Sequence, residues 1–283
     1  FHGDTFGAMS VSGLSVYNGP FEDFLLAIER IPVPNDRNIG ELESRLKTIL
    51  QEEEVAAFIF EPLVQGAAAM HMYPGRHLEV LMKLARNHGA LTIADEVMTG
   101  FGKTGRNFAC DYLKENPDII CLSKSLTAGV APMALTCCTQ NVFDAFYDRE
   151  VSKGFFHGHT YSANPLACAA AIAGMDLLAT ETIQESIQRI AGKHLQFQSE
   201  VQGHPMVKST RSLGVIFALD LNLETERYGN LRDRLYRFFM DQGVFLRPLG
   251  NTIYLLPPFT ISEGELNVLY ASVMNCLEML NNE

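Results

Sequence analysis

Three short apolar runs, with helical patterns before and between them, constrain the fold of this chain more than any other feature. Residues 55–60, 90–94 and 118–122 are rich in residue types that favour β-strands. Residues 41–51 and 77–88 instead repeat leucines at helical spacing. Strands that alternate with helices predict βαβ units and a mostly parallel sheet, so we expect an α/β fold.

The pattern changes near residue 180. Before that point we expect another strand over residues 133–139 and an alanine-rich helix over residues 165–178. After it the sequence predicts a long helix over 183–201, strands near 213–221, 244–247 and 252–256, and a final helix from Glu263. We therefore predict a large domain over residues 1–180 and a smaller α+β domain over residues 181–283.

Charge and hydropathy narrow the class of partners. The net charge is −11, from 22 basic and 33 acidic residues, and no Lys/Arg run is present, which argues against a nucleic-acid-binding face. No apolar stretch has the length of a membrane span, and the start does not resemble a signal peptide. We therefore expect neither nucleic-acid nor membrane partners. Because the chain opens with Phe1 and not with Met, we expect it to begin within a larger protein.

The cysteines indicate a compartment but no metal site. Most of the six lie in apolar segments, and their spacing is not that of zinc ligands: Cys110, Cys121, Cys137, Cys138, Cys168 and Cys276. On a strand, the adjacent Cys137 and Cys138 would point to opposite faces. The sequence therefore predicts buried free thiols in a reducing cytoplasm.

A polar pair directly follows each of the first three apolar runs. These pairs are Glu61-Pro62, Asp95-Glu96 and Ser123-Lys124. In an open parallel sheet, ligands bind beyond the carboxyl ends of the strands. We therefore expect these side chains to converge on one crevice, which is the candidate site.

Lys124 and Asp95 point to a particular cofactor chemistry. Lys124 follows an apolar strand and precedes Gly-Val-Ala-Pro, which predicts partial burial. A desolvated lysine is a competent amine nucleophile for Schiff-base formation. Asp95 could cap a helix, bind a metal or hold a cofactor, and a carboxylate beside the pyridine nitrogen of pyridoxal phosphate keeps that ring protonated. Together the two residues would supply both anchors of this cofactor.

Two other site classes fit less well. Asp95-Glu96 after a strand and Gly102-Lys103-Thr104 resemble parts of an ATPase, but the phosphate loop needs a glycine where Val97 stands, and the order of the two motifs is reversed. His157 and His159 are spaced for one face of a strand, but no carboxylate or cysteine lies close enough in sequence to complete a metal site. The stretch around them is more simply a structured loop.

Three segments, in this order and at this spacing, resemble the signature of the class III aminotransferases. They are Ala94 to Gly105 (ADEVMTGFGKTG), Leu122 to Gly129 (LSKSLTAG) and His157 to Ala167 (HGHTYSANPLA). The resemblance extends over essentially the whole chain through residues 1–11, 61–67, 244–250 and 253–258. It implies a fold-type I aminotransferase whose large domain is only partly present, because the family's phosphate-binding Gly-Ser loop would lie upstream of Phe1.

The resemblance also implies roles for individual residues. Lys124 would be the catalytic residue that carries pyridoxal 5'-phosphate, and Asp95 would hold the pyridine nitrogen. Phe1 stands where the family usually stacks a tyrosine on the ring, so the stacking is kept and the hydroxyl is lost. Thr160 would bind the cofactor phosphate of the neighbouring subunit, which implies a homodimer with a shared active site. The remaining cofactor-binding positions are His2, Gly158 and His159.

Three further residues are candidates for substrate binding. By resemblance Arg247 binds the substrate carboxylate with Asp4 close to it, and Tyr254 is a third candidate. A planar guanidinium suits a carboxylate, although Arg247 could instead cap the turn that follows it. Tyr254 could be packing in an alternating strand, and Thr160 could serve only to start the alanine-rich helix.

The expected partners are a small-molecule amino donor and a keto acceptor. Met98 stands where many relatives, the ornithine-type enzymes among them, carry a glutamine that bonds the phenolic oxygen of the cofactor. This departure disfavours that branch, although another class III aminotransferase stays open. A truncated, non-catalytic module with the cofactor fold is the alternative from a different class.

Overall fold

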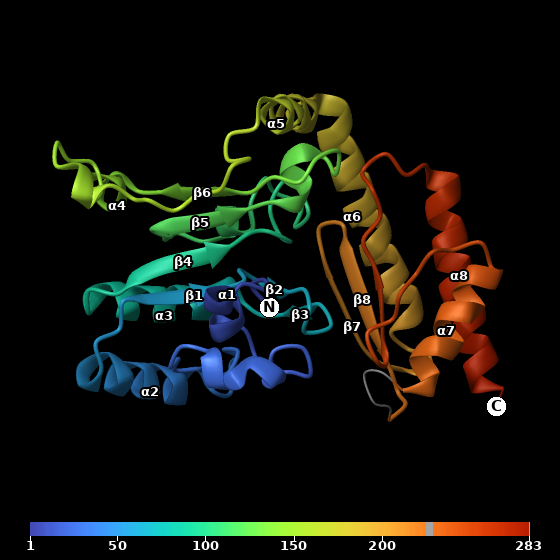
Figure 1. The fold of residues 1–283 in the computed structure, drawn as a ribbon. Coiled ribbons are helices and arrows are strands. Elements are labelled where there is room, and N and C mark those ends of the chain that lie inside the picture. The colour runs from blue at the N-terminus through green and yellow to red at the C-terminus, as the bar shows by residue number, and fades with distance from the viewer. Residues whose placement is uncertain (225–228, 283) are drawn as a thin grey trace. The chain divides into compact units, whose positions relative to one another are not determined.

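The computed structural model describes residues 1–224 and 229–282, which form two compact units (Figure 1). Unit 1 comprises Phe1–Gly66, Met72–Phe101 and Phe108–Asp176. Unit 2 comprises Ala67–His71, Gly102–Asn107 and Leu177–Glu283. Two short segments therefore belong to unit 2 although unit 1 flanks them in sequence, and no local sequence pattern predicts this arrangement.

A four-stranded sheet organises unit 1. Its strands, in the order β1-β4-β5-β6, are β1 (Ala57–Phe60), β4 (Leu91–Asp95), β5 (Ile119–Leu122) and β6 (Leu135–Cys138). The first three strands are mutually parallel and β6 runs antiparallel to β5. All four predicted strands and the mostly parallel sheet are confirmed.

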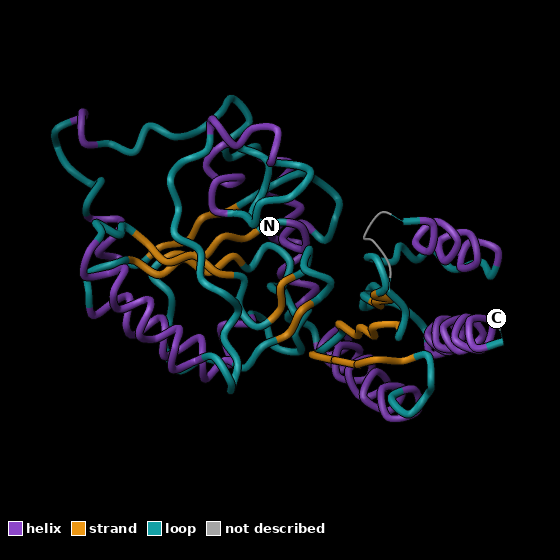
Figure 2. Tube along the Cα trace, turned by 90° about the horizontal axis from the view of Figure 1, so that it is seen from below, coloured by secondary structure: helices purple, strands orange, loops and turns teal. Residues whose placement is uncertain are grey.

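Two amphipathic helices pack beside this sheet. In unit 1, α3 (Gly75–Asn87) packs against β1 and β4, and α2 (Ile39–Glu52) packs against α3 (Figures 1 and 2). The leucines that predicted these helices form the contact, since Leu42, Leu46 and Leu50 of α2 are buried with Leu81 and Ala85 of α3. Burying each leucine contributes about 2 kcal/mol. The two helices are therefore stabilised by the periodicity from which they were predicted.

One further long helix and several short elements complete the first 178 residues. They are α1 (Phe6–Val11), β2 (Val64–Gln65), β3 (His71–Met72), α4 (Gln140–Asp144), α5 (Pro165–Leu178) and the 3₁₀ turns Gly19–Phe24, Ala109–Tyr112, Lys124–Thr127 and Val151–Lys153. The predicted alanine-rich helix is confirmed as α5. Within the described residues, no single helix is long and apolar enough to cross a membrane, and α5 and α6 (Glu181–Val201) meet that test only as a bent pair.

Unit 2 is built on an antiparallel sheet of three strands in the order β7-β8-β9. The strands are β7 (Val207–Leu213), β8 (Ile216–Leu221) and β9 (Thr252–Leu255), and the helices after α6 are α7 (Asn230–Asp241) and α8 (Glu263–Asn281). The core contains Phe197, Phe217, Phe239 and Leu277. The long helix, the strands near β8 and β9 and the final helix are confirmed. Neither β7 nor α7 was predicted, because β7 is a polar edge strand and α7 carries many charges.

The predicted strand over residues 244–247 is wrong. Val244 and Leu246 are buried while Phe245 and Arg247 are exposed, so the alternation that prompted the prediction is present. The segment nevertheless lies outside the sheet, since β7 and β9 occupy both edges of β8. Alternating hydropathy reports burial on one side of an extended chain and does not by itself report a strand partner.

The six cysteines are free, but only two of them are buried as predicted, and Cys121 and Cys168 are partly buried. Cys110 and Cys276 are buried, whereas Cys137 and Cys138 are exposed on β6. All four residues of β6 are exposed, and this strand lies at the edge of its sheet. An apolar sequence predicts a strand here but does not predict what covers it.

A fully buried histidine lies inside unit 2. The Nδ1 atom of His194 is 2.7 Å from the hydroxyl of Tyr270, and its Nε2 atom is 3.1 Å from the carbonyl oxygen of Val215. The two bonds fit a neutral ring in which Nε2–H donates and Nδ1 accepts. Burial lowers the pKa of His194 to about 4.

We expect this histidine to make unit 2 sensitive to acid. Between about pH 6.5 and pH 4 the unfolded chain binds a proton at His194 and the folded chain does not, so the free energy of unfolding falls as the pH falls through that window. The loss should reach roughly 3 kcal/mol. Urea unfolding across this range should show a shallower pH dependence in His194→Gln. The exposed His88→Gln is the control, and an unchanged slope in His194→Gln would contradict the assignment.

Candidate active site

The candidate residues of unit 1 follow neighbouring strands of one sheet. Asp95 ends β4 and pairs in register with Cys121 of β5. The backbone N–H of Glu96 donates to the carbonyl of Cys121 at 3.0 Å, so the pairing continues to the point where β4 ends. Lys124 comes three residues after Cys121, at the same edge of the sheet. Parallel pairing therefore brings the ends that carry Asp95 and Lys124 next to each other.

Asp95 is a buried carboxylate with both oxygens occupied. Its Oδ2 atom is 2.7 Å from Nδ1 of His2, and its Oδ1 atom accepts from the backbone N–H of Val97 at 3.0 Å. Only 6% of Asp95 is exposed. His2 is fixed in turn, since its backbone N–H donates to Oγ of Ser12 at 2.9 Å. Two candidates that lie far apart in sequence, His2 and Asp95, thus lie in direct contact.

The neighbours of His2 are more open. Phe1 is 53% exposed, and Asp4 is exposed on the other side of Gly3. Gly3 has φ +125°, a conformation that a residue with a side chain rarely adopts, and a Cβ there would lie 3.3 Å from Cβ of Ala8. Glycine therefore allows the chain to turn from His2 into α1.

Lys124 is exposed, so the predicted partial burial is wrong. It opens the 3₁₀ turn Lys124–Thr127 with φ 44°, a left-handed conformation that costs a non-glycine residue about 1 kcal/mol or more. Oγ of Ser123 donates to the carbonyl of Met133 at 2.7 Å, and Oγ1 of Thr127 donates to that of Ala131 at 2.5 Å. These bonds fix the turn beyond the end of β5. The side chain of Lys124 therefore lies outside the apolar segment that precedes it.

Glu96 has a structural role that the sequence did not reveal. Its Oε2 atom accepts from Oγ1 of Thr99 at 2.6 Å and from the N–H of Ala109 at 3.0 Å, and its Oε1 atom accepts from the N–H of Cys110 at 2.7 Å. Glu96 is completely buried. Three donors, two of them at the start of a 3₁₀ turn, compensate the burial of this carboxylate. The adjacent acids of the Asp95-Glu96 pair therefore face different surroundings.

Glu61, which follows β1, is the third strand-end carboxylate. It is buried, its Oε1 atom accepts from the N–H of Gly66 at 3.1 Å, and burial raises its pKa. Met98 packs against the same turn, since a Cβ on Gly66 would lie 3.2 Å from Cε of Met98. The apolar thioether of Met98 therefore lies close to this turn, and a side chain at position 66 would crowd it.

The loop that precedes α5 carries four candidates, His157, Gly158, His159 and Thr160, and all four are exposed. Thr160 opens a turn five residues before α5 begins at Pro165. It therefore neither caps nor starts that helix, so the alternative role that the sequence left open for Thr160 is wrong. The turn is held by Oγ of Ser162, which accepts from the N–H of His159 at 3.0 Å. Among the described residues, no hydrogen bond or ion pair joins this loop to Asp95 or Lys124.

Arg247 and Tyr254 belong to unit 2. Arg247 is exposed between Leu246 and Pro248, which are both buried, so its side chain projects from an anchored segment. Tyr254 is half-buried on β9, where it pairs in register with Ala218. A role for Arg247 in carboxylate binding and a role for Tyr254 beside it stay predictions.

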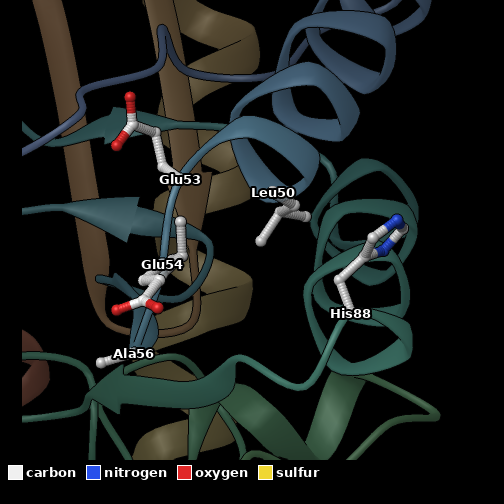
Figure 3. A pocket seen from close by; sticks show the side chains of 6 residues that line it. Leu50, Glu53, Glu54, Ala56 and His88 are labelled. Carbon is white, nitrogen blue, oxygen red and sulfur yellow. The ribbon is translucent and has the colours of Figure 1, made fainter.

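A hollow of about 360 Å³ lies elsewhere in unit 1 (Figure 3). Its lining includes Glu53, Glu54, Ala56 and His88. Ala56 precedes β1, so the hollow lies at the amino ends of the strands, away from the candidate residues. Figure 3 shows the ring of His88 directed away from the two carboxylates. Across residues 1–224 and 229–282, no group of three His, Cys, Asp or Glu is placed to hold a metal ion.

Comparisons with known proteins converge on one family. A match to the family described as aminotransferase class-III covers residues 1–277. The adenosylmethionine-8-amino-7-oxononanoate aminotransferase of Synechococcus elongatus is 41% identical over 98% of this chain and 67% of its own length. The crystal structure of the enzyme of that name from Methanocaldococcus jannaschii is similar with a TM-score of 0.89 at 32% identity, over 97% of this chain and 66% of its own.

A further solved structure concerns the cofactor. The PMP-bound form of an aminotransferase from Vibrio fluvialis matches 100% of this chain and 67% of its own, with a TM-score of 0.86 at 25% identity. The chain thus spans about two thirds of the length of the proteins it matches. The fold-type I architecture expected from the sequence is confirmed by these neighbours.

Glu96 leads to a prediction about stability. Glu96→Gln replaces one acceptor oxygen by an amide NH₂, which then faces an N–H or O–H donor in a buried site. We expect the free energy of unfolding to fall by about 1–3 kcal/mol, measured by urea unfolding. Glu43→Gln, at an exposed position on α2, is the matched control and should change stability little. Equal unfolding midpoints for the two variants would overturn the structural role given to Glu96.

Proposed function

The chain belongs to the class-III aminotransferase family, and from that premise we propose that its protein transfers an amino group from S-adenosylmethionine to 8-amino-7-oxononanoate. The product is 7,8-diaminononanoate, and the step belongs to biotin biosynthesis. The observation that carries the proposal is the buried His2–Asp95 pair at the end of β4, next to the strand end that presents Lys124. The names of the most similar relatives support this acceptor.

Two alternative functions differ from this proposal, one in its substrate and the other in lacking catalysis. Another class III aminotransferase, ω-amino or ornithine-type, would keep the same cofactor residues and change the substrate. The packing of Met98 against Gly66 favours the first assignment, since a thioether cannot replace the hydrogen bonds of the glutamine usual in the ornithine-type branch. A truncated, non-catalytic module would need neither an accessible Lys124 nor a buried, bonded Asp95. The sequence alone leaves the amino donor open between S-adenosylmethionine and lysine.

Pyridoxal 5'-phosphate fits the residues of unit 1. Lys124 presents an exposed amine for covalent attachment, and Asp95 presents a buried carboxylate that is held by hydrogen bonds to His2 and Val97. Phe1 would stack on the ring, and Gly158, His159 and Thr160 would serve the phosphate of the neighbouring subunit. When bound, this cofactor supplies an electron sink for the electrons released at the substrate carbon.

The chain's own residues would handle the protons. Lys124 would remove the proton from the amine-bearing carbon of the donor and return one to the carbon that becomes aminated. Asp95 would keep a proton on the ring nitrogen throughout. His2, bonded to Oδ2 of Asp95 at 2.7 Å, would orient that carboxylate.

Substrate recognition would fall on Arg247, Asp4 and Tyr254. The acceptor carries a carboxylate far along its chain from the keto group, and a guanidinium can bind a carboxylate through two parallel hydrogen bonds. Arg247 is exposed on an anchored segment, which suits this task. Asp4 and Tyr254 would bind other parts of the substrate.

A homodimer is part of the proposal. On α5, Leu166, Ile172 and Met175 are 80%, 62% and 52% exposed. The preceding segment adds further exposed aromatic residues, namely Phe143, Tyr147, Phe155, Phe156 and Tyr161. Apolar surface of this kind marks protein interfaces, and Thr160 lies within the segment that carries these aromatic residues. We place the protein in the cytoplasm, since its free, exposed Cys137 and Cys138 suit a reducing compartment.

The half-reaction tests the function directly. The visible absorbance of the purified full-length protein with pyridoxal phosphate should bleach on addition of 7,8-diaminononanoate, since the reverse reaction removes its amino group. Bleaching by S-adenosylmethionine but not by lysine would support the proposed donor. A band that responds only to other amines would replace the substrate assignment, and the absence of any band would favour the non-catalytic module.

Lys124 should be essential for turnover. In Lys124→Ala we expect activity to fall at least about 10⁴-fold, because the general acid/base and the point of attachment are both lost. Lys114→Ala, at an exposed position in unit 1, is the control and should keep its activity. Unchanged turnover in Lys124→Ala would remove the proposed mechanism.

The α5 surface should control assembly. Ile172→Glu would place an unpaired charge in the proposed interface, which we expect to weaken the dimer at least about tenfold in sedimentation velocity. Val268→Glu changes an apolar residue on α8 that is 52% exposed, and this control should leave assembly unchanged. A dimer of wild-type strength in Ile172→Glu would place the interface elsewhere.

A further inference from the structure

Arg211 of β7 forms a saturated polar cluster to which the proposed function gives no role. Its Nη1 and Nη2 atoms donate to the two carboxylate oxygens of Asp220 at 2.7 and 2.9 Å. Its Nε atom donates to the carbonyl of Met70 at 2.8 Å, and Nη2 also donates to that of Ala69 at 2.5 Å. One half-buried guanidinium therefore joins the β7–β8 hairpin to the inserted segment Ala67–His71, all within unit 2.

Asp220 extends the cluster to a second segment. Besides Arg211, its carboxylate accepts from Oγ of Ser209 and from Oγ1 of Thr252, each at 2.6 Å. Burial alone would raise the pKa of Asp220, but these hydrogen bonds hold it below the ordinary value, so the pair is ionised at neutral pH. A bidentate pair of this kind fixes geometry as well as energy.

The first segment is strained. Ala69 and Met70 have φ of 58° and 54°, and two consecutive non-glycine residues in the left-handed region cost on the order of 1–3 kcal/mol each. Arg211 bonds the carbonyl of each strained residue. The segment continues directly from Gly66, whose N–H donates to Glu61. Arg211 and Asp220, called the clamp below, therefore stabilise a strained conformation.

The second segment carries the carboxylate-binding candidate. Leu249 and Thr252 exchange backbone hydrogen bonds of 2.9 and 3.1 Å across a tight turn, and the N–H of Leu221 donates to the carbonyl of Asn251 at 2.8 Å. The bond from Thr252 to Asp220 anchors this turn to β8. Arg247 lies two residues before the turn.

We propose that Arg211 and Asp220 are a positioning pair for the substrate carboxylate. Neither residue contacts substrate. The pair fixes the turn that follows Arg247 and, through the same guanidinium, the strained segment that continues from Gly66. Loss of the pair frees both segments, so the segment that carries Arg247 is no longer held in one position for binding a carboxylate. This inference rests on the proposed function, because it takes Arg247 as the carboxylate-binding residue.

Two amines that differ only at the carboxylate test the pair. In the full-length holoenzyme, half-reaction rates are measured with 7,8-diaminononanoate and with its methyl ester. Arg211→Gln and Asp220→Asn should raise the half-saturating concentration of the diaminononanoate about tenfold or more and leave that of the ester unchanged. Arg247→Gln should give the same selective loss. Arg211→Lys should not restore binding, since an ammonium cannot reproduce the fork of bonds to Asp220 and two carbonyls.

A second ion pair in unit 2 provides the control. Lys193→Gln removes the 2.6 Å pair with Glu263 in the same unit, and both amines should react as in the wild type. Equal losses for both amines in Arg211→Gln and Asp220→Asn would reduce the pair to a stabilising contact, and no loss in either would remove it from substrate binding. Both results overturn the inference.

His71 gives a readout that needs no substrate. Burial and the positive charge of Arg211 lower the pKa of His71, and the charge of Asp220 opposes them. In an NMR titration, Arg211→Gln should raise this pKa and Asp220→Asn should lower it. If the wild type does not distinguish the acid from the ester, the proposed role of Arg247 fails. An unchanged His71 titration in both variants overturns the clamp itself.

Discussion

The parallel pairing of β4 with β5 is the constraint on which the candidate site depends. Because Asp95 pairs with Cys121 and the N–H of Glu96 still donates to the carbonyl of Cys121, both strands end at one edge of the sheet. A shift of one residue would turn Asp95 to the opposite face. The backbone register of β4 and β5 therefore decides where the site lies, and the side chains at the two strand ends decide what it can bind.

Two adjacent carboxylates show how that register assigns roles. Asp95 bonds a histidine from the start of the chain, while Glu96 bonds two backbone N–H groups and a hydroxyl in the interior. Successive residues at a strand end point to opposite sides. One acid can therefore face a cofactor while its neighbour supports the loop behind it, and hydrogen-bond donors compensate the burial of Glu96.

The sequence predicted the parts of the molecule in which one local pattern decides the structure. The leucine stripes of α2 and α3 and the apolar runs of β1, β4 and β5 each report their own burial. Patterns that depend on a distant partner were less informative. Residues 244–247 alternate without a strand partner, β6 is apolar but exposed, and the turn that frees Lys124 is set by bonds to Met133 and Ala131. The donors that surround Glu96 lie up to fourteen residues away, and no motif marks them.

The inserted segments are the clearest case of information that no local pattern carries. Ala67–His71 and Gly102–Asn107 follow directly after the stretches that contain Glu61 and Asp95, yet both pack within unit 2. Arg211 holds the first, and the β7–β8 turn holds the second, since the N–H of Val215 donates to Lys103 and a Cβ on Gly214 would lie 2.1 Å from the backbone of Thr104. One hairpin thus fixes the continuation of two site-bearing stretches. The contacts that fix both continuations come from residues more than a hundred positions away in sequence, which is why no local pattern around Glu61 or Asp95 could predict them.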